Sequence, residues 1–149
     1  MDDLRWRRRD IKTTSLLPAC LAKQIAKSSG FDDAWLIENG FVTEGGSSNA
    51  YIVTADDKII TRPLSNDILH GITRASLLQL ANDFDIEIEE REFTIEEAYT
   101  AKEAFVSSAT TFIWPVINID GNTIGNGTPG KLTKKLRDIY IKMAIDTAR

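Results

Sequence analysis

This sequence contains one cysteine and one histidine in 149 residues. A lone cysteine, Cys20, cannot form an internal disulfide, which favours a cytoplasmic location. A lone histidine, His70, and the absence of any Cys-x-x-Cys pair leave little support for a zinc site or a Ser-His-Asp triad, so we expect no bound metal. Because Cys20 follows an apolar stretch, we expect its thiol to be buried and unreactive.

The sequence also lacks long apolar runs and an excess of positive charge. No stretch reaches membrane-spanning length, and the N-terminus lacks the apolar core of a signal peptide. The net charge of −4 gives no electrostatic case for binding nucleic acid or an anionic membrane. Glycine-rich patterns for triphosphates and dinucleotides are absent. A short basic run near the N-terminus is interpreted as the solvated face of a strand, and its members are Arg5, Arg7, Arg8 and Arg9.

The remaining composition is that of an ordinary globular protein. Hydrophobic residues make up 42% and charged residues 27% of the chain, which is enough for one domain with a substantial core. Apolar residues at helical spacing predict helices over 18–28, 73–83 and 131–147. Thr94, followed three residues later by Glu97, is a capping box that predicts one further short helix.

Alternating and β-rich segments lie between these helices. We expect a strand over 4–17, hairpin turns at 39–40, 56–57 and 120–121, a half-exposed strand over 85–93, and two strands broken around Pro115. This succession of hairpins and single helices predicts an α+β domain with a mainly antiparallel, strongly curved sheet. We find no internal repeat and no linker.

Three short stretches carry groups suited to chemistry. In "DIKTTSLL", Lys12 lies in an apolar run, where a dry amine could condense with a carbonyl, although an amine in solvent is more common. In "LHGITRA", Gly71, Ile72 and Thr73 open a helix whose N–H groups and hydroxyl could hold a phosphate or simply cap the helix. In "VSSATTF", hydroxyl residues gather around Ala109, a pattern that also fits an exposed strand end.

A fourth stretch, "FVTEGGSSNAYIV", places a single carboxylate, Glu44, before two glycines and a strand expected to be buried. Together with "DIKTTSLLP", "LHGITRA", "SSATTFIWPV" and a late "NGTPG", it resembles the class IV aminotransferases, pyridoxal-phosphate enzymes of fold type IV. The most similar subgroup is that of the D-amino-acid aminotransferases. The resemblance covers essentially the whole chain, in the order and spacing of that family.

The resemblance implies a fold as well as a cofactor. Residues 1–149 would form a single cofactor-binding domain, the larger C-terminal domain of a D-amino-acid aminotransferase-like protein. Its sheet would be curved, mainly antiparallel and barrel-like, with flanking helices. The smaller N-terminal domain of the family would be absent from this chain.

The resemblance also implies the roles of two charged residues. Lys12 corresponds to the Schiff-base lysine, which would bind pyridoxal 5'-phosphate covalently and then move a proton as general acid and base. Glu44 would face the pyridine nitrogen of the cofactor. A carboxylate there keeps the nitrogen protonated, so that the ring can accept electrons from the substrate.

Further residues would surround the ring and its phosphate. Ser47 and Ser48 would lie beside the ring, Asn49 would fix the turn, and Leu69 would pack against the ring. The phosphate cup would be built from Gly71, Ile72 and Thr73 on one side and Ser108, Ala109 and Thr110 on the other.

Many members of the family have a threonine at the position of Ala109. In this chain the phosphate contact of that threonine would have to come from the backbone N–H of Ala109 or Thr110, or from the Thr110 hydroxyl.

The implied reaction is transamination between a D-amino acid, such as D-alanine, and a 2-oxo acid, in a cytoplasmic homodimer. In the family, the N-terminal domain supplies a phosphate-binding arginine and much of the substrate carboxylate pocket, so we expect a truncated half or one that requires a separate N-terminal half. Three alternatives remain: a branched-chain aminotransferase, an aminodeoxychorismate lyase-like enzyme, and an inactive remnant domain.

Overall fold

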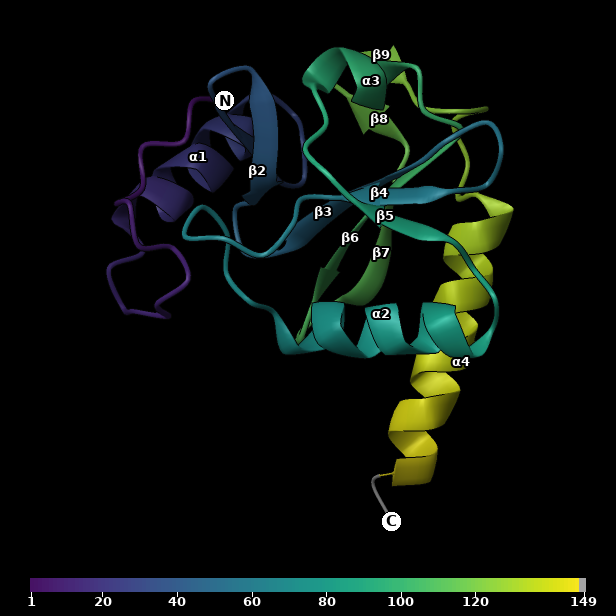
Figure 1. Cartoon of the computed structure of the whole chain (residues 1–149). Helices are drawn as coiled ribbons and strands as arrows, with labels where there is room; N and C mark the ends of the chain where they lie inside the picture. Colours follow the sequence, from purple (N-terminus) through teal and green to yellow (C-terminus); the bar gives the residue numbers. More distant parts are fainter. Residues whose placement is uncertain (148–149) are drawn as a thin grey trace.

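Five strands form the central sheet of this chain, which the computed structural model describes over residues 1–147 (Figure 1). The strand order is β5-β4-β3-β6-β7, and every neighbouring pair is antiparallel except the parallel pair β4–β5. The strands are β3 (Asn49–Val53), β4 (Ile59–Thr61), β5 (Ile88–Glu90), β6 (Glu103–Ser108) and β7 (Phe112–Val116). The expected α+β class with a mainly antiparallel sheet is confirmed.

The expected barrel-like closure needs correction. Strands β5 and β7 pair on one side only, so this sheet keeps two edges and the sheets of the described residues do not close into a barrel. Pro115 does not break the sheet as expected, because it lies within β7 opposite Phe105. An edge strand tolerates proline, since one side of its backbone needs no partner.

Two further hairpins are closed by the predicted turns. The first joins β1 (Trp35–Glu38) to β2 (Phe41–Gly45) through Asn39 and Gly40, with φ angles of 53° and 84°. Two successive positive φ angles define the type I′ turn that matches strand twist. The second joins β8 (Asn118–Ile119) to β9 (Asn122–Thr123) through residues 120–121.

Four helices flank the sheets, close to the predicted positions. They are α1 (Leu17–Ser28), α2 (Ile72–Asp83), α3 (Ile95–Tyr99) and α4 (Lys131–Thr147). The capping box of α3 is present, with Glu97 N–H donating to Thr94 Oγ1 at 3.2 Å and Thr94 N–H donating to Glu97 Oε2 at 3.0 Å. None of the helices within residues 1–147 is long and apolar enough to cross a bilayer.

The central sheet is covered on both faces, which explains why β3 is buried at every residue. Helices α2 and α4 cover one face (Figure 1). They pack through Leu77 and Leu136 against Tyr51 and Phe105, whose stacked ring centroids are 4.6 Å apart. The opposite face forms a separate core with Phe93 and the surroundings of α3. Helix α1 packs against β1 through a small separate cluster that includes the alanines of the helix.

Two expectations for the N-terminal third are wrong. Residues 4–17 form no strand: the segment is irregular up to the start of α1, with Leu4 77% and Trp6 50% exposed. The N-terminus pairs with β1 through a single bridge between Asp2 and Ile37, before this segment begins, and the described residues show no strand pairing for the segment itself. Cys20 is exposed rather than buried, because α1 turns its alanine face, not this residue, toward β1.

The start of α4 is capped from a distance by a buried carboxylate. Glu103 accepts hydrogen bonds from Leu132 N–H at 3.0 Å, Thr133 N–H at 2.8 Å and Thr133 Oγ1 at 2.7 Å. A Cβ at Gly130 would overlap this carboxyl group, which explains why a glycine precedes the helix.

Glu103→Ala should therefore destabilise the fold by about 2–3 kcal/mol, since the N–H groups of Leu132 and Thr133 lose their acceptor in a buried position. Urea unfolding followed by circular dichroism measures the change. Glu96→Ala, an exposed change at the start of α3, is the matched control and should cost much less. Equal losses for the two variants would contradict this account of the cap.

Candidate active site

The carboxylate of Glu44, at the end of β2, is only 4% exposed and is held by three groups. Leu69 N–H lies 3.1 Å from both of its oxygens, and Asn49 Nδ2 donates to Oε2 at 3.0 Å. The guanidinium of Arg5 pairs with Oε1. Tertiary structure thus joins three residues that the sequence assigned to one site: Glu44, Asn49 and Leu69.

The charge state of this carboxylate depends on its surroundings. Burial raises the pKa of Glu44 above its ordinary value, while the charge and hydrogen bond of Arg5 and the Leu69 N–H offset part of that rise. Burial alone would lower the pKa of Arg5, but Asp3 and Glu44 outweigh it and raise that pKa. A buried, oriented carboxylate of this kind suits a cationic ligand group such as a protonated ring nitrogen.

Asn49 connects the carboxylate to the start of α2. Its Nδ2 also donates to Leu69 O at 3.0 Å, and a Cβ at Gly71 would overlap its Oδ1. Gly71 is therefore required by close packing against Asn49, and it is the N-cap residue of α2. The two glycine-bearing motifs of the sequence meet at this point.

The predicted phosphate residues lie at the same end of the sheet. Asn49, at the start of β3, pairs with Ser107 near the end of β6, so Ser108 follows directly beyond it. Thr73, in the first turn of α2, is 2% exposed and its Oγ1 has no hydrogen-bond partner among the described residues. Ile72 is 72% exposed. Buried polar groups usually have a hydrogen-bond partner, so this hydroxyl is suited to bind a polar ligand.

The β6–β7 turn carries the other predicted hydroxyl groups. Ser108 Oγ lies 2.7 Å from Thr111 Oγ1 and 3.2 Å from Thr110 Oγ1, and Ala109 is exposed at the tip. Ser107, which the sequence analysis did not select, is bonded to Tyr51 Oη at 2.8 Å. The turn thus exposes hydroxyl and backbone groups, while the strand that leads into it is held by the buried bond between Ser107 and Tyr51.

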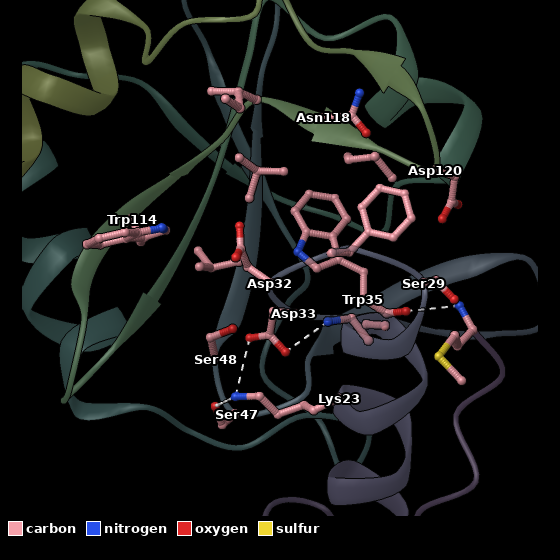
Figure 2. Close-up of a pocket in the computed structure, with 18 of the residues that line it drawn as sticks. Lys23, Ser29, Asp32, Asp33, Trp35, Ser47, Ser48, Trp114, Asn118 and Asp120 are labelled. Atoms are coloured by element: carbon pink, nitrogen blue, oxygen red, sulfur yellow. Dashed lines mark hydrogen bonds and ion pairs between the residues drawn. The ribbon is translucent and has the colours of Figure 1, made fainter.

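A cavity of about 780 Å³ opens beside this region (Figure 2). Four of the predicted residues line it: Ser47, Ser48, Ser108 and Thr110. Lys23 Nζ donates to Ser47 Oγ at 3.0 Å, and the indole rings of Trp35 and Trp114 add apolar surface (Figure 2). Neither Lys12 nor Glu44 lines this cavity, so it adjoins the Glu44 cluster and does not contain it.

Lys12 lies in the exposed loop that precedes α1, and not in a strand as its sequence context suggested. Within residues 1–147 its amine forms no hydrogen bond or ion pair with a side chain or backbone group. The structure therefore leaves this lysine available on the surface. Its convergence with Glu44 and the phosphate residues remains a prediction.

The basic run near the N-terminus is not the solvated strand face that we expected. The side chains of Arg5 and Arg9 are 15% and 3% exposed, and both are engaged by carboxylates. Asp3, with a fully buried side chain, pairs with Arg5 at 2.6 Å and contacts Arg9 at 3.5 Å. Asp3 is a near neighbour in sequence, but the other acidic partners are 39 residues from Arg5 (Glu44) and 29 residues from Arg9 (Glu38), so local charge spacing could not indicate them.

Acid should release this N-terminal segment. Hydrogen bonds from Arg5 and Thr43 outweigh burial and lower the pKa of Asp3, and the hydrogen bond from Arg9 lowers the pKa of Glu38. Carboxyls with lowered pKa values stabilise the fold above about pH 4, and that stability is lost as the pH falls through the folded pKa.

The free energy of unfolding of the wild-type chain should therefore fall steeply below about pH 4, and less steeply for Asp3→Asn. Glu44 has a raised pKa, so its protonation changes the free energy of unfolding with the opposite sign. Both chains contain Glu44, so the difference between their pH dependences reports Asp3. Urea titrations by tryptophan fluorescence from pH 3 to 7 would measure it. Asp57→Asn, at an exposed turn, should follow the wild type.

Comparison with known proteins places these motifs in a family. The profile of amino-transferase class IV matches residues 1–119. The D-alanine aminotransferase of Bacillus licheniformis is 45% identical over 136 residues, 91% of this chain and 48% of that protein. The D-alanine aminotransferase of Staphylococcus aureus (strain N315) is 39% identical over 95% of this chain and 50% of that protein.

Solved structures show the same architecture. The branched-chain amino acid aminotransferase of Thermobaculum terrenum, in its PLP form, superposes with a TM-score of 0.86 at 32% identity over 96% of this chain and 47% of that chain. The branched-chain aminotransferase of Escherichia coli gives 0.83 at 29% identity, over 92% and 49%. The chain thus spans about half the length of the relatives that it matches.

Proposed function

We propose that this chain, which belongs to the class IV aminotransferases, is the cofactor-binding half of a D-amino-acid aminotransferase that uses pyridoxal 5'-phosphate. The observation that carries the proposal is the fixed Glu44 carboxylate, held by Leu69 N–H, Asn49 and Arg5 beside the start of α2. A carboxylate in this arrangement would hold a proton on the pyridine nitrogen.

The residues present fit the cofactor. The hydroxyl of Thr73, which has no hydrogen-bond partner among the described residues, and the N-terminal N–H groups of α2 suit a phosphate. Gly71, at the N-cap of α2, lets this helix start pack closely against Asn49. The hydroxyl and backbone groups at Ser108, Ala109 and Thr110 would supply the other side. When bound, pyridoxal phosphate supplies an electron sink for the bond-breaking step at the substrate Cα.

Lys12 would perform the proton transfers. Its exposed loop position leaves the amine free to condense with an aldehyde and later to carry a proton to and from the substrate carbon. Ser47, Ser48 and Leu69 would flank the ring. Our proposal is that these groups and the Glu44 cluster act on one bound cofactor, with Lys12 as the catalytic residue.

We propose D-alanine and a 2-oxo acid as substrates, because the two relatives compared above by sequence are named D-alanine aminotransferases. Branched-chain transamination is the second candidate, since the solved structures of similar fold are branched-chain enzymes. We further propose a cytoplasmic homodimer. We also propose that full activity requires an N-terminal half, because the match spans only 48% of the Bacillus licheniformis enzyme.

The first test is cofactor binding. Purified chain incubated with pyridoxal phosphate should acquire a visible absorbance band that borohydride bleaches, and peptide mass spectrometry should find the reduced pyridoxyl group on Lys12. Lys12→Ala should lose the band, whereas Lys27→Ala, a second exposed lysine on α1, should keep it. Absence of the band in the wild-type chain, or labelling elsewhere, would favour the inactive remnant.

A further inference from the structure

Arg9 is a buried side chain of the N-terminal segment that lies near three carboxylates. It is 5% exposed and forms a bidentate pair with Glu38, with Nη1 at 2.7 Å from Oε2 and Nη2 at 3.0 Å from Oε1. Its Nε lies 3.5 Å from Asp3 Oδ2, and its Nη1 lies 3.8 Å from Asp67 Oδ1. One guanidinium therefore joins β1, the N-terminal segment and the loop before α2.

The same loop also carries the backbone group that binds Glu44. Arg9 N–H donates to Asn66 O at 2.9 Å, and three residues later in that loop Leu69 N–H donates to both Glu44 oxygens. The loop is thus bonded at one end to the segment that leads into Lys12 and at the other to the carboxylate. Its position fixes the two relative to each other.

The chain between this anchor and the lysine is short and turned. Ile11 N–H donates to Arg8 O at 3.1 Å, which closes a tight turn around Arg9, and Lys12 follows directly. Only two residues separate the buried guanidinium from the exposed lysine. Loss of the guanidinium would remove its contacts with Glu38 and Asp67 and so loosen the lysine-bearing loop. The backbone bond from Arg9 N–H to Asn66 O and the bond from Leu69 N–H to Glu44 do not depend on this side chain.

We propose that Arg9 is a positioning residue, which sets Lys12 against the cofactor ring by anchoring the lysine loop to Glu38 and to residues 66–67. The inference rests on the proposed function, because Arg9 can position Lys12 in this way only if the chain binds the cofactor. A lysine cannot replace Arg9 fully, because its single ammonium lacks the planar fork that binds Glu38 through two bonds.

Two forms of the cofactor separate positioning from folding. Pyridoxal phosphate binds both the pocket and Lys12, whereas pyridoxamine 5'-phosphate has no aldehyde and tests the pocket alone. In the full 149-residue chain, Arg9→Met should weaken pyridoxal phosphate about tenfold and leave pyridoxamine phosphate within about twofold. The control Arg8→Met, in the same run but with an exposed side chain, should change neither.

A double-variant cycle completes the test. In a Lys12→Ala background, Arg9→Met should have no further effect on pyridoxal phosphate affinity. Glu38→Gln, which removes the carboxylate that Arg9 binds, should give the same selective loss of affinity for pyridoxal phosphate. This variant keeps the test possible if Arg9→Met does not fold. Thermal unfolding of each variant reports its stability independently.

Equal weakening of both cofactor forms by Arg9→Met would show a merely structural role and overturn the inference. No effect on either form would overturn it too, and leave the proposed function standing. If the wild-type and Lys12→Ala chains bind pyridoxal phosphate equally, the proposed role of Lys12 fails, and this inference fails with it.

Discussion

The 149-residue chain alone should transaminate D-alanine with 2-oxoglutarate at least about 100-fold more slowly than the roughly 10 per second of an ordinary enzyme. Bond breaking at the substrate Cα requires alignment with Lys12, and neither Lys12 nor Glu44 lines the cavity beside Ser47 and Ser48. About half of the length of the similar enzymes has no counterpart here.

Supplying the portion of a relative that this chain does not match should raise the rate. The portion of the Bacillus licheniformis enzyme that this chain does not match would be added in trans, and pyruvate formation followed with pyridoxal phosphate in excess. The same mixture with Lys12→Ala should stay inactive, which ties the recovered activity to this chain. Ordinary turnover by the chain alone would show that it already holds a complete site.

Glu44→Gln should lower kcat of the reconstituted enzyme by about 10² or more, with a much smaller change in KM. An amide cannot stabilise a proton on the pyridine nitrogen, so the ring would lose most of its power to accept electrons. The variant keeps the shape of the side chain and leaves Arg5 paired with Asp3 at 2.6 Å, so the fold should survive.

Glu87→Gln is the matched control, because this carboxylate is 69% exposed and pairs only with surface Lys58. It should retain wild-type kcat and KM. A loss of kcat for Glu44→Gln that is fully matched by a loss of bound cofactor would point to a purely structural carboxylate. An unchanged kcat would remove Glu44 from the proposed chemistry.

Local signals in the sequence were sufficient for most of the secondary structure. The helices α1, α2 and α4 follow from their apolar spacing, and the Asn39-Gly40 turn follows from residues that accept positive φ. Such features depend on contacts between residues a few positions apart. The alternation in residues 4–17 wrongly predicted a strand for the same reason: a strand needs a partner strand, and no local pattern shows whether one pairs with it.

The sequence by itself also determined the family, because Glu44, Gly71 and Lys12 lie in motifs whose order and spacing can be recognised in the sequence alone. Only the tertiary structure decided how the carboxylate is held. The bonds to Glu44 from Leu69 and Arg5 join positions 25 and 39 residues apart in the chain, and only the bond from Asn49 is local. Burial of Arg9 was equally invisible, because a guanidinium becomes buried only where folding places carboxylates around it, and those partners lie on β1 and in the loop before α2.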